Sequence, residues 1–430
     1  MKLNKEISQC RLCKNKKFKK IINLYNQNLS GVFPEHINKQ PSKAPLELTR
    51  CTFCNLIQLA HYANINEMYG KTYGYHSSIS PLMISHLKKK ADHIIKKIKF
   101  TNKDNILDIG CNDGSFLNFF KKTKVQRFGI DPSSKKFAKN FQKGIKIIFN
   151  FFNKKTIIKK FKNIKFKFIS SIAMFYDIEK PIDFVNDIKN LLSKDGMWGV
   201  ELSYMPLMLK NLTYDQICHE HVTYWGLTEF KVLAEKCNLK IVDVFLNEIN
   251  GGSFYILLAH KNSKYVCNIK KINKLLKDEK KLISFNAFKR FKQRIIDHKI
   301  KIKSYLKKCK KNKIKVYGYG ASTKGNIVLN YCKISKNDLV SICDSNPEKE
   351  NLFTPGTCIP IITKKEFRII NPKIALVLIW PFRKEVLRDE KKFIFSGGEL
   401  IFSLPRFHIV NKNNYYKYLK EPLGKLGFNY

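Results

Sequence analysis

The chain has 430 residues, of which 44% are hydrophobic and 13% aromatic. This composition excludes a disordered chain and favours two or three folded domains. Lysine and arginine outnumber aspartate and glutamate by 81 to 34, for a formal net charge of +47, but they are spread along the whole chain. Without a basic tail or an aromatic-interleaved basic repeat, a nucleic-acid partner is not expected, whereas anionic small molecules are favoured. No run of eighteen apolar residues occurs, so no membrane span is expected.

Two close cysteine pairs stand in the first sixty residues. Cys10 and Cys13 form one C-x2-C pair, and Cys51 and Cys54 form the second. Each pair can supply two thiolates from one tight turn, and four thiolates close a tetrahedral zinc site. We therefore predict a structural zinc module over residues 1–70. The start of the chain lacks the apolar core of a secretion signal and the other cysteines are scattered, so a cytoplasmic location is expected.

From Asn105 onward, apolar strand-like and helix-like segments alternate, as in a parallel, doubly wound sheet. This pattern predicts a central α/β domain over residues 71–265. The expected elements are, in chain order, helix 84–98, strand 106–109, helix 116–120, strands 128–130 and 166–172, helix 183–192, and strands 197–202, 241–245 and 254–258.

A lysine-rich helical connector is expected over residues 266–312, with an apolar stripe that indicates core packing. A second α/β alternation predicts a C-terminal domain over residues 313–430. Its expected elements are strand 315–317, helix 326–331, and strands 339–343, 374–379 and 399–402. The stripe consists of Phe285, Phe288, Phe291, Ile295 and Ile302.

The turn after strand 106–109 has the pattern D-x-G-x-x-x-G and not the dinucleotide pattern GxGxxG. Glycines at such a turn let a ligand approach the backbone, and the next helix presents free amides. The carboxylates of this turn suit a ligand with a cationic amine and sulfonium, while Asp131, after the next strand, can accept both ribose hydroxyls. An ordinary βα turn with a helix cap is the alternative. The predicted S-adenosylmethionine-binding residues are Asp108, Gly110, Cys111, Asn112, Asp113, Gly114 and Asp131.

Nearly the whole chain resembles the bacterial sugar C-methyltransferase family. The order of the matching motifs is more specific than any motif alone. These motifs are CRLC, CTFC, YGYHSS at 73–78, ILDIGCNDGSFL at 106–117, HEHVTYW at 219–225, GGSF at 251–254, YGYGASTKGN at 317–326 and WPFR at 380–383. The resemblance implies an α/β fold with an N-terminal zinc-binding module, a central class I methyltransferase domain and a C-terminal Rossmann-like domain.

The resemblance also implies roles in a reaction at carbon, which requires a base to remove a proton beside a ketone and donors to stabilise the enolate. His221 matches the family's base, and Glu220 matches a site carboxylate that orients the base or the substrate. Tyr75 matches a tyrosine that reaches the site, although a surface-loop position is an equal alternative. A zinc or packing role is the alternative for the two histidines of HEH.

The chain departs from the family pattern at two positions. Cys218 stands where members commonly have tyrosine, and Asp177 lies near a position where a histidine is usual. His219 as a further catalytic group, or Tyr224 at the substrate, is expected to compensate for the missing phenol.

In the C-terminal domain, a glycine-containing loop follows the first expected strand. Such a loop can hold a phosphate through backbone amides, with a lysine adding charge. The resemblance implies that this loop binds the nucleotide part of the substrate, and a plain βα turn is the alternative. The residues concerned are Gly318, Gly320, Ser322 and Lys324.

Together these patterns predict an S-adenosylmethionine-dependent enzyme with structural zinc that methylates a carbon of a nucleotide-linked keto-deoxysugar. Three alternatives remain: a nucleic-acid methyltransferase, a methyltransferase acting on oxygen or nitrogen, and a zinc-containing binding protein without activity. The first lacks an NPPY-type motif and a catalytic cysteine dyad. The complete set of Asp108, Gly110, Gly114 and Asp131 argues against the last. The sequence makes no prediction of the oligomeric state.

Overall fold

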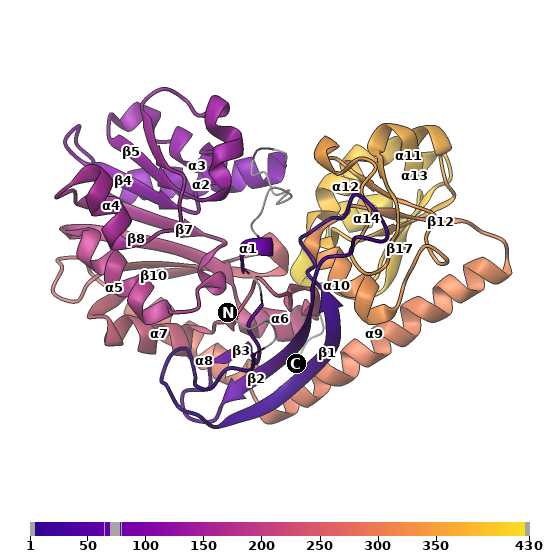
Figure 1. Ribbon diagram of the computed structural model, residues 1–430, viewed down its shortest axis with the longest axis horizontal. Helices are drawn as coiled ribbons and strands as arrows, with labels where there is room; N and C mark the ends of the chain where they lie inside the picture. Colours follow the sequence, from indigo (N-terminus) through magenta and orange to yellow (C-terminus); the bar gives the residue numbers. More distant parts are fainter. Residues whose placement is uncertain (1–4, 64, 69–77, 79, 426–430) are drawn as a thin grey trace.

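The structure is a computed structural model that describes residues 5–63, 65–68, 78 and 80–425. Within these residues, the strands form three sheets of four, seven and six strands. Figure 1 shows two α/β lobes side by side, with the N-terminal strands below and between them and the long helix α9 passing beneath both. This arrangement confirms the predicted α/β fold.

The seven-stranded central sheet has the order β10-β11-β8-β7-β4-β5-β6. β4 to β8 are mutually parallel, whereas β11 runs antiparallel to both of its neighbours. The carboxyl ends of β4, β5, β7 and β8 therefore meet at one edge, where ligands of such sheets bind. The strands are β4 (Asn105–Ile109), β5 (Gln126–Ile130), β6 (Ile145–Ile148), β7 (Phe166–Ile172), β8 (Leu192–Ser203), β10 (Leu239–Asn247) and β11 (Ser253–His260).

Helices cover both faces of this sheet. α2 begins after Ser80, whose hydroxyl accepts a hydrogen bond from the Met83 amide, and Pro81 occupies its first turn. Its apolar side packs on one face, while α4, α5 and α7 cover the other. The helix expected over 116–120 is only four residues long, because the chain turns out of the helix at Phe119. The helices are α1 (Ile65–Met68), α2 (Pro81–Lys97), α3 (Ser115–Asn118), α4 (Lys154–Phe161), α5 (Pro181–Leu191), α6 (Met205–Asn211) and α7 (Leu227–Lys236).

The N-terminal module is built on two long antiparallel strands, β1 (Phe18–Asn28) and β2 (Lys43–Cys51). Between the two cysteine pairs the sequence shows few long periodic segments, so these strands were not expected. The sheet continues with β3 (Ile57–Leu59) and ends with β9 (Thr223–Tyr224), which comes from the central domain. The module is therefore not closed at residue 70, because its fourth strand lies in the HEHVTYW segment.

The connector is helical, as predicted, and the structure divides it into two helices, α8 (Ile269–Leu282) and α9 (Phe285–Lys311). Ser284 caps α9 by accepting a hydrogen bond from the Ala287 amide. Four residues of the predicted apolar stripe are buried, and the side chain of Phe285 lies outside the described part. The buried residues are Phe288, Phe291, Ile295 and Ile302.

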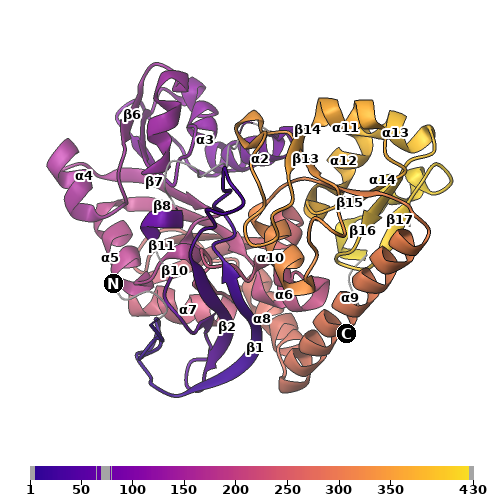
Figure 2. The same cartoon turned by 45° about the vertical axis from the view of Figure 1, so that its right-hand side comes forward.

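The C-terminal sheet has the order β14-β13-β12-β15-β16-β17, with β17 antiparallel and the other strands parallel. Figure 2 shows this sheet between its helices, with α10 turned toward the N-terminal strands. The strands are β12 (Val316–Tyr319), β13 (Ile342–Asp344), β14 (Ile361–Thr363), β15 (Ile374–Val377), β16 (Glu399–Phe402) and β17 (His408–Val410). The helices are α10 (Thr323–Cys332), α11 (Lys364–Ile370), α12 (Arg383–Asp389), α13 (Lys391–Phe395) and α14 (Tyr415–Lys420).

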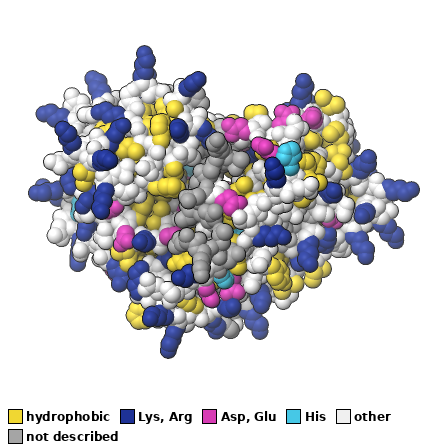
Figure 3. All heavy atoms as spheres, viewed as in Figure 1, with side chains coloured by type: hydrophobic (Ala, Val, Ile, Leu, Met, Phe, Trp, Pro, Cys, Tyr) yellow, Lys and Arg dark blue, Asp and Glu magenta, His cyan; other side chains and the backbone are white. Residues whose placement is uncertain are grey.

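Among the described helices, none is long and apolar enough to cross a membrane. On the face drawn in Figure 3, lysine and arginine side chains are scattered over both lobes and form no continuous stripe. This face agrees with the sequence, in which lysine is dispersed along the chain.

Candidate active site

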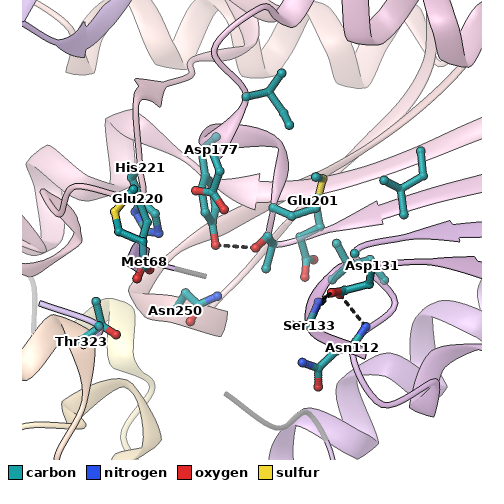
Figure 4. A pocket seen from close by; sticks show the side chains of 18 of the residues that line it. Met68, Asn112, Asp131, Ser133, Asp177, Glu201, Glu220, His221, Asn250 and Thr323 are labelled. Atoms are coloured by element: carbon teal, nitrogen blue, oxygen red, sulfur yellow. Dashed lines mark hydrogen bonds between the residues drawn. The ribbon is translucent and has the colours of Figure 1, made fainter. Parts of the chain in front are cut away.

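A cavity of about 790 Å³ lies at the carboxyl edge of the central sheet, and all three domains contribute to its wall. Asp108 and Asp131 belong to one end, whereas Glu220 and His221 belong to the other. Figure 4 shows Asp131 and Asn112 across the cavity from His221, Glu220 and Thr323. The predicted cofactor turn and the HEH segment therefore open into one space.

At the first end, the turn after β4 has the backbone shape that its glycines predicted. Gly110 has φ +74°, and a Cβ there would lie 3.0 Å from Met174 Cγ. Both observations exclude a larger residue at this position. The turn is anchored to the sheet, since the Gly110 amide donates a hydrogen bond to the Ile130 carbonyl (2.9 Å).

Asp131 joins this turn to the next one. Its Oδ2 accepts a hydrogen bond from the Asn112 amide (2.9 Å), and its Oδ1 accepts from the amide and the hydroxyl of Ser133 (both 2.6 Å). Each carboxylate oxygen has two lone pairs, so Oδ1 is fully used and Oδ2 can still accept one hydrogen bond from a ligand hydroxyl. Asp131 thus has the chemistry of a ribose ligand.

Asp108 is a buried carboxyl in the same wall, and the Ser170 hydroxyl donates a hydrogen bond to it (2.6 Å). Burial raises the pKa of Asp108 to about 7, and the Ser170 hydrogen bond opposes the rise. A cationic ligand placed there would favour the carboxylate. Two aspartates and a glycine turn that leaves room for a ligand fit S-adenosylmethionine.

Five of the seven predicted cofactor residues line the cavity, but Asp113 and Gly114 do not. Asp113 accepts hydrogen bonds from the amides of Ser78 (2.8 Å) and Ser115 (3.1 Å). Gly114 has φ +77°, and a Cβ there would be 2.6 Å from the Phe141 ring. Both residues shape the turn, and their contact with the cofactor stays a prediction. The five lining residues are Asp108, Gly110, Cys111, Asn112 and Asp131.

At the second end, His221 is held in one tautomer. Its Nδ1 donates a hydrogen bond to the Gln216 carbonyl (2.9 Å), and its ring packs against Tyr176 with centroids 3.9 Å apart. Nε2 is therefore the nitrogen with a lone pair. Burial, reinforced by the charge of Lys324, lowers the pKa of His221 to about 3, so the ring is neutral at physiological pH.

Glu220 is half-buried in the same wall, and its Oε1 is a buried atom without a hydrogen-bond partner in the described structure. Burial raises the pKa of Glu220 to about 7, although Lys324 opposes the rise. A carboxyl that titrates near neutrality and has an unsatisfied oxygen is poised to bind or exchange a proton.

Two other predicted residues that the structure describes, His219 and Tyr224, do not line the cavity. His219 lies away from it, with Nε2 donating to the Ala44 carbonyl of β2 (3.0 Å). Tyr224 belongs to β9, and its hydroxyl donates to the Gln216 carbonyl (3.2 Å). His219 attaches the HEH segment to β2, and Tyr224 attaches it to β3 through the pairing of β9. Tyr75 lies outside the described residues.

The glycine loop of the C-terminal domain does not present the amides that were predicted to hold phosphate. The Gly318 amide donates to the Ser341 carbonyl (2.8 Å), and the Gly320 amide donates to the Cys343 carbonyl (2.7 Å). Both are used within the sheet, and neither glycine lines the cavity. Ser322 and Lys324 do line it, at the start of α10.

Sequence reasoning missed Glu201, which lies at the end of β8 and lines the cavity. His86 contacts its Oε1 (2.7 Å), Lys90 forms an ion pair with it, and Asn247 donates to its Oε2 (2.8 Å). Burial favours a raised pKa for Glu201, but Lys90 and His86 outweigh it and hold the pKa below its ordinary value. The sequence feature that could have identified Glu201 is its position as a charged residue at the end of the otherwise apolar strand 197–202.

The four cysteines of the N-terminal module converge as predicted. Their Sγ atoms all lie within 4.8 Å of one another. Two amides point at the sulfurs, with Leu12 N donating to Cys10 Sγ and Phe53 N donating to Cys51 Sγ (both 3.4 Å). Four soft donors in this grouping fit a closed, tetrahedral zinc site.

Comparison with known proteins matches each of the three domains. Residues 10–69 match a family described as a zinc binding domain, residues 83–244 a methyltransferase domain, and residues 248–405 a C-methyltransferase C-terminal domain. C-methyltransferase NovU from Streptomyces niveus is 24% identical over 412 residues, which cover 94% of this chain and 97% of the relative.

Solved structures match the chain more weakly. The plantazolicin methyltransferase BpumL, in complex with a triazolic desmethylPZN analog and SAH, is 15% identical with a TM-score of 0.34, and covers 43% of this chain and 86% of that chain. The mitomycin 7-O-methyltransferase MmcR is 12% identical with a TM-score of 0.32. The match covers 41% of this chain and 54% of that chain. Similarity at this level supports no conclusion about substrate.

Proposed function

We propose that this chain methylates a carbon beside the keto group of a nucleotide-linked deoxysugar. It belongs to the C-methyltransferase family that joins a zinc-binding domain, a methyltransferase domain and a C-methyltransferase C-terminal domain. The observation that carries the proposal is the single cavity that joins the cofactor turn to His221 and Glu220. S-adenosylmethionine supplies an electrophilic methyl group when bound, and Asp108, Gly110 and Asp131 would hold it.

His221 is the proposed base. A neutral imidazole with its Nδ1 hydrogen bonded to the Gln216 carbonyl has only Nε2 available to take a proton. Nε2 would take the acidic proton from the carbon beside the ketone. The electron pair of that bond would form a carbon–carbon double bond, and the carbonyl π pair would move onto the ketone oxygen. The low pKa of His221 makes it a weak base, so the site must also make that proton more acidic.

The nucleotide is proposed to lie at the C-terminal domain. Ser322 and Thr323 line the cavity at the N-terminus of α10, where free amides and the helix dipole favour phosphate. Lys349 lines the same part of the wall. This assignment replaces the amides of Gly318 and Gly320, which the sheet uses.

A small-molecule acceptor is favoured over nucleic acid because the candidate groups lie inside a cavity and the basic residues are dispersed. A cytoplasmic location is part of the proposal, since a four-thiolate zinc site needs reduced cysteines.

The test is proton exchange without a methyl donor. The purified protein is incubated in deuterated water with dTDP-4-keto-6-deoxyglucose, and deuterium entry beside the ketone is followed by NMR. The proposal predicts enzyme-dependent exchange at one carbon, and then methylation of that carbon when S-adenosylmethionine is added. Methylation of an oxygen or nitrogen in the absence of exchange, or no exchange across a set of nucleotide-linked keto-sugars, would refute it.

A further inference from the structure

Lys324 reaches the acceptor end of the cavity from a different domain than His221. It is the second residue of α10, and its Nζ donates a hydrogen bond to Asn250 Oδ1 of the methyltransferase domain (3.1 Å). Lys324, Glu220, His221 and Cys218 all line the same wall. The sequence predicted that this lysine binds a phosphate of the substrate. In the structure it lies among the side chains that are proposed to act on the ketone.

Burial and neighbouring charges act in opposite directions on the ammonium group of Lys324. Burial lowers its pKa, while the negative charges of Asp215 and Glu220 oppose that change. Asp215 is buried and already accepts a hydrogen bond from Trp380 Nε1 (2.7 Å). Lys324, hydrogen bonded to Asn250, therefore lines the same cavity as the neutral His221.

A second lysine of the C-terminal domain in the wall is differently engaged. Lys349 donates a hydrogen bond to the Ala321 carbonyl (2.6 Å) and lies 3.7 Å from Asp344. Both partners belong to its own domain. Lys349 is therefore held near the proposed nucleotide end, whereas Lys324 is directed toward the methyltransferase domain.

The proposed reaction needs a group that stabilises the enolate oxygen. That group must be a hydrogen-bond donor or a cation. Cys218 lines the cavity, but a thiol is a weak donor. Burial raises the pKa of Cys218, so it stays a neutral thiol.

We propose that Lys324 is a catalytic residue that stabilises the oxyanion formed on the acceptor, and this role rests on the proposed function. As the carbon–hydrogen bond breaks, its proton goes to His221 Nε2 and its electron pair forms the carbon–carbon double bond. The carbonyl π pair moves to oxygen, where the Lys324 ammonium group binds it. When the carbon takes the methyl group, the carbonyl re-forms, the carbon–sulfur pair stays on sulfur, and the proton leaves to water. The ammonium group gains and loses no proton, so the step balances.

The experiment compares Lys324→Met with Lys336→Met, an exposed lysine of the same domain. Deuterium exchange into dTDP-4-keto-6-deoxyglucose at saturating concentration, without methyl donor, reports enolate formation alone. We expect Lys324→Met to lose exchange and kcat by roughly 100- to 1000-fold, the usual cost of removing one oxyanion donor. S-adenosylmethionine affinity by calorimetry and the circular dichroism melting curve should match wild type. Lys336→Met should behave as wild type in every assay.

A second variant guards against a purely structural effect. Lys324→Ala should regain part of its exchange when ethylammonium is added, because a small cation can occupy the vacated site. If Lys324→Met exchanges at the wild-type rate and only its KM for the sugar nucleotide rises, the lysine binds phosphate and the proposal is wrong. Lost exchange in Lys324→Ala without any amine rescue would also overturn it. A wild-type protein without exchange would instead refute the proposed function itself.

Discussion

Gly31 of the N-terminal module lies directly against Glu220 of the methyltransferase domain. A Cβ on Gly31 would be 2.3 Å from Glu220 Oε1 and 3.4 Å from Thr323 Oγ1 of the C-terminal domain. The three domains therefore meet at one carboxylate in the cavity wall. The N-terminal module is therefore part of the cavity wall and not only a separate zinc-binding unit.

Replacing Gly31 with alanine should displace the Glu220 carboxylate, because no side chain tolerates a contact of 2.3 Å. We expect methyl transfer to fall by about 10- to 100-fold, as misplaced catalytic groups usually cost. Zinc content and S-adenosylmethionine affinity should not change. Gly424→Ala is the matched control, since its Cβ would meet Glu248 only at 3.9 Å. Equal loss of cofactor affinity in Gly31→Ala would show that the effect is not local to Glu220.

Replacing His221 with alanine should reduce kcat by about two to four orders of magnitude, the span expected for a lost general base. Deuterium exchange in the absence of methyl donor should disappear, while cofactor affinity stays within twofold of wild type, as roughly expected for a group that touches only the acceptor. His36→Ala, an exposed position, is the control. Exchange that persists in His221→Ala would assign the base to another group, with Glu220 the nearest candidate.

Replacing Asp131 with alanine should weaken S-adenosylmethionine binding by about 1–3 kcal/mol, because ribose hydroxyls lose their acceptor and the Asn112 and Ser133 amides lose theirs. Titration calorimetry measures the change. Ser133→Ala removes only one hydroxyl donor to the same carboxylate and should have a much smaller effect. Unchanged affinity in Asp131→Ala would place the cofactor elsewhere.

The zinc module should hold about one zinc ion per chain, bound by Cys10, Cys13, Cys51 and Cys54. Cys51→Ser should lose the metal and melt at a lower temperature, because zinc binding contributes folding free energy. Cys267→Ser, outside the cluster, should keep both properties. Metal analysis by mass spectrometry decides the point, and a folded, active protein without zinc would contradict it.

Glu229 makes stability depend on pH. It is buried beside Glu279, and burial followed by that neighbouring charge raises its pKa from 4.5 to about 8. The folded state therefore binds this proton more tightly than the unfolded state. Its contribution to stability is complete below pH 4.5 and is lost as the pH rises through about 8.

Glu229→Gln should remove this dependence, since glutamine can still accept the hydrogen bond from the Gly226 amide. In urea unfolding, wild type should lose stability relative to the variant between pH 5 and 9, by on the order of a few kcal/mol. Glu235→Gln, exposed on the same helix, is the control. A constant difference between wild type and Glu229→Gln across this range would refute the argument.

Local pattern was enough to predict most elements of the central domain. β7 has the predicted bounds 166–172, and β4 and β5 differ from prediction by one or two residues. Apolar runs between turn residues determine such strands directly. Prediction failed at the helix expected over 116–120, and it missed β1 and β2, whose partly exposed faces leave no continuous apolar signal.

The sequence by itself determined the groups whose members stand close together in the chain. The two C-x2-C pairs and the turn from Asp108 to Asn112 carry their chemistry in short segments whose geometry follows from local backbone preferences. Only the tertiary structure decided that Gly31, Glu220 and Lys324 share one cavity, and that the amides of Gly318 and Gly320 are used by the sheet. Gly31, Glu220 and Lys324 lie more than one hundred positions from one another, and side-chain packing between domains brings them together. The spacing of residues along the chain does not predict that packing.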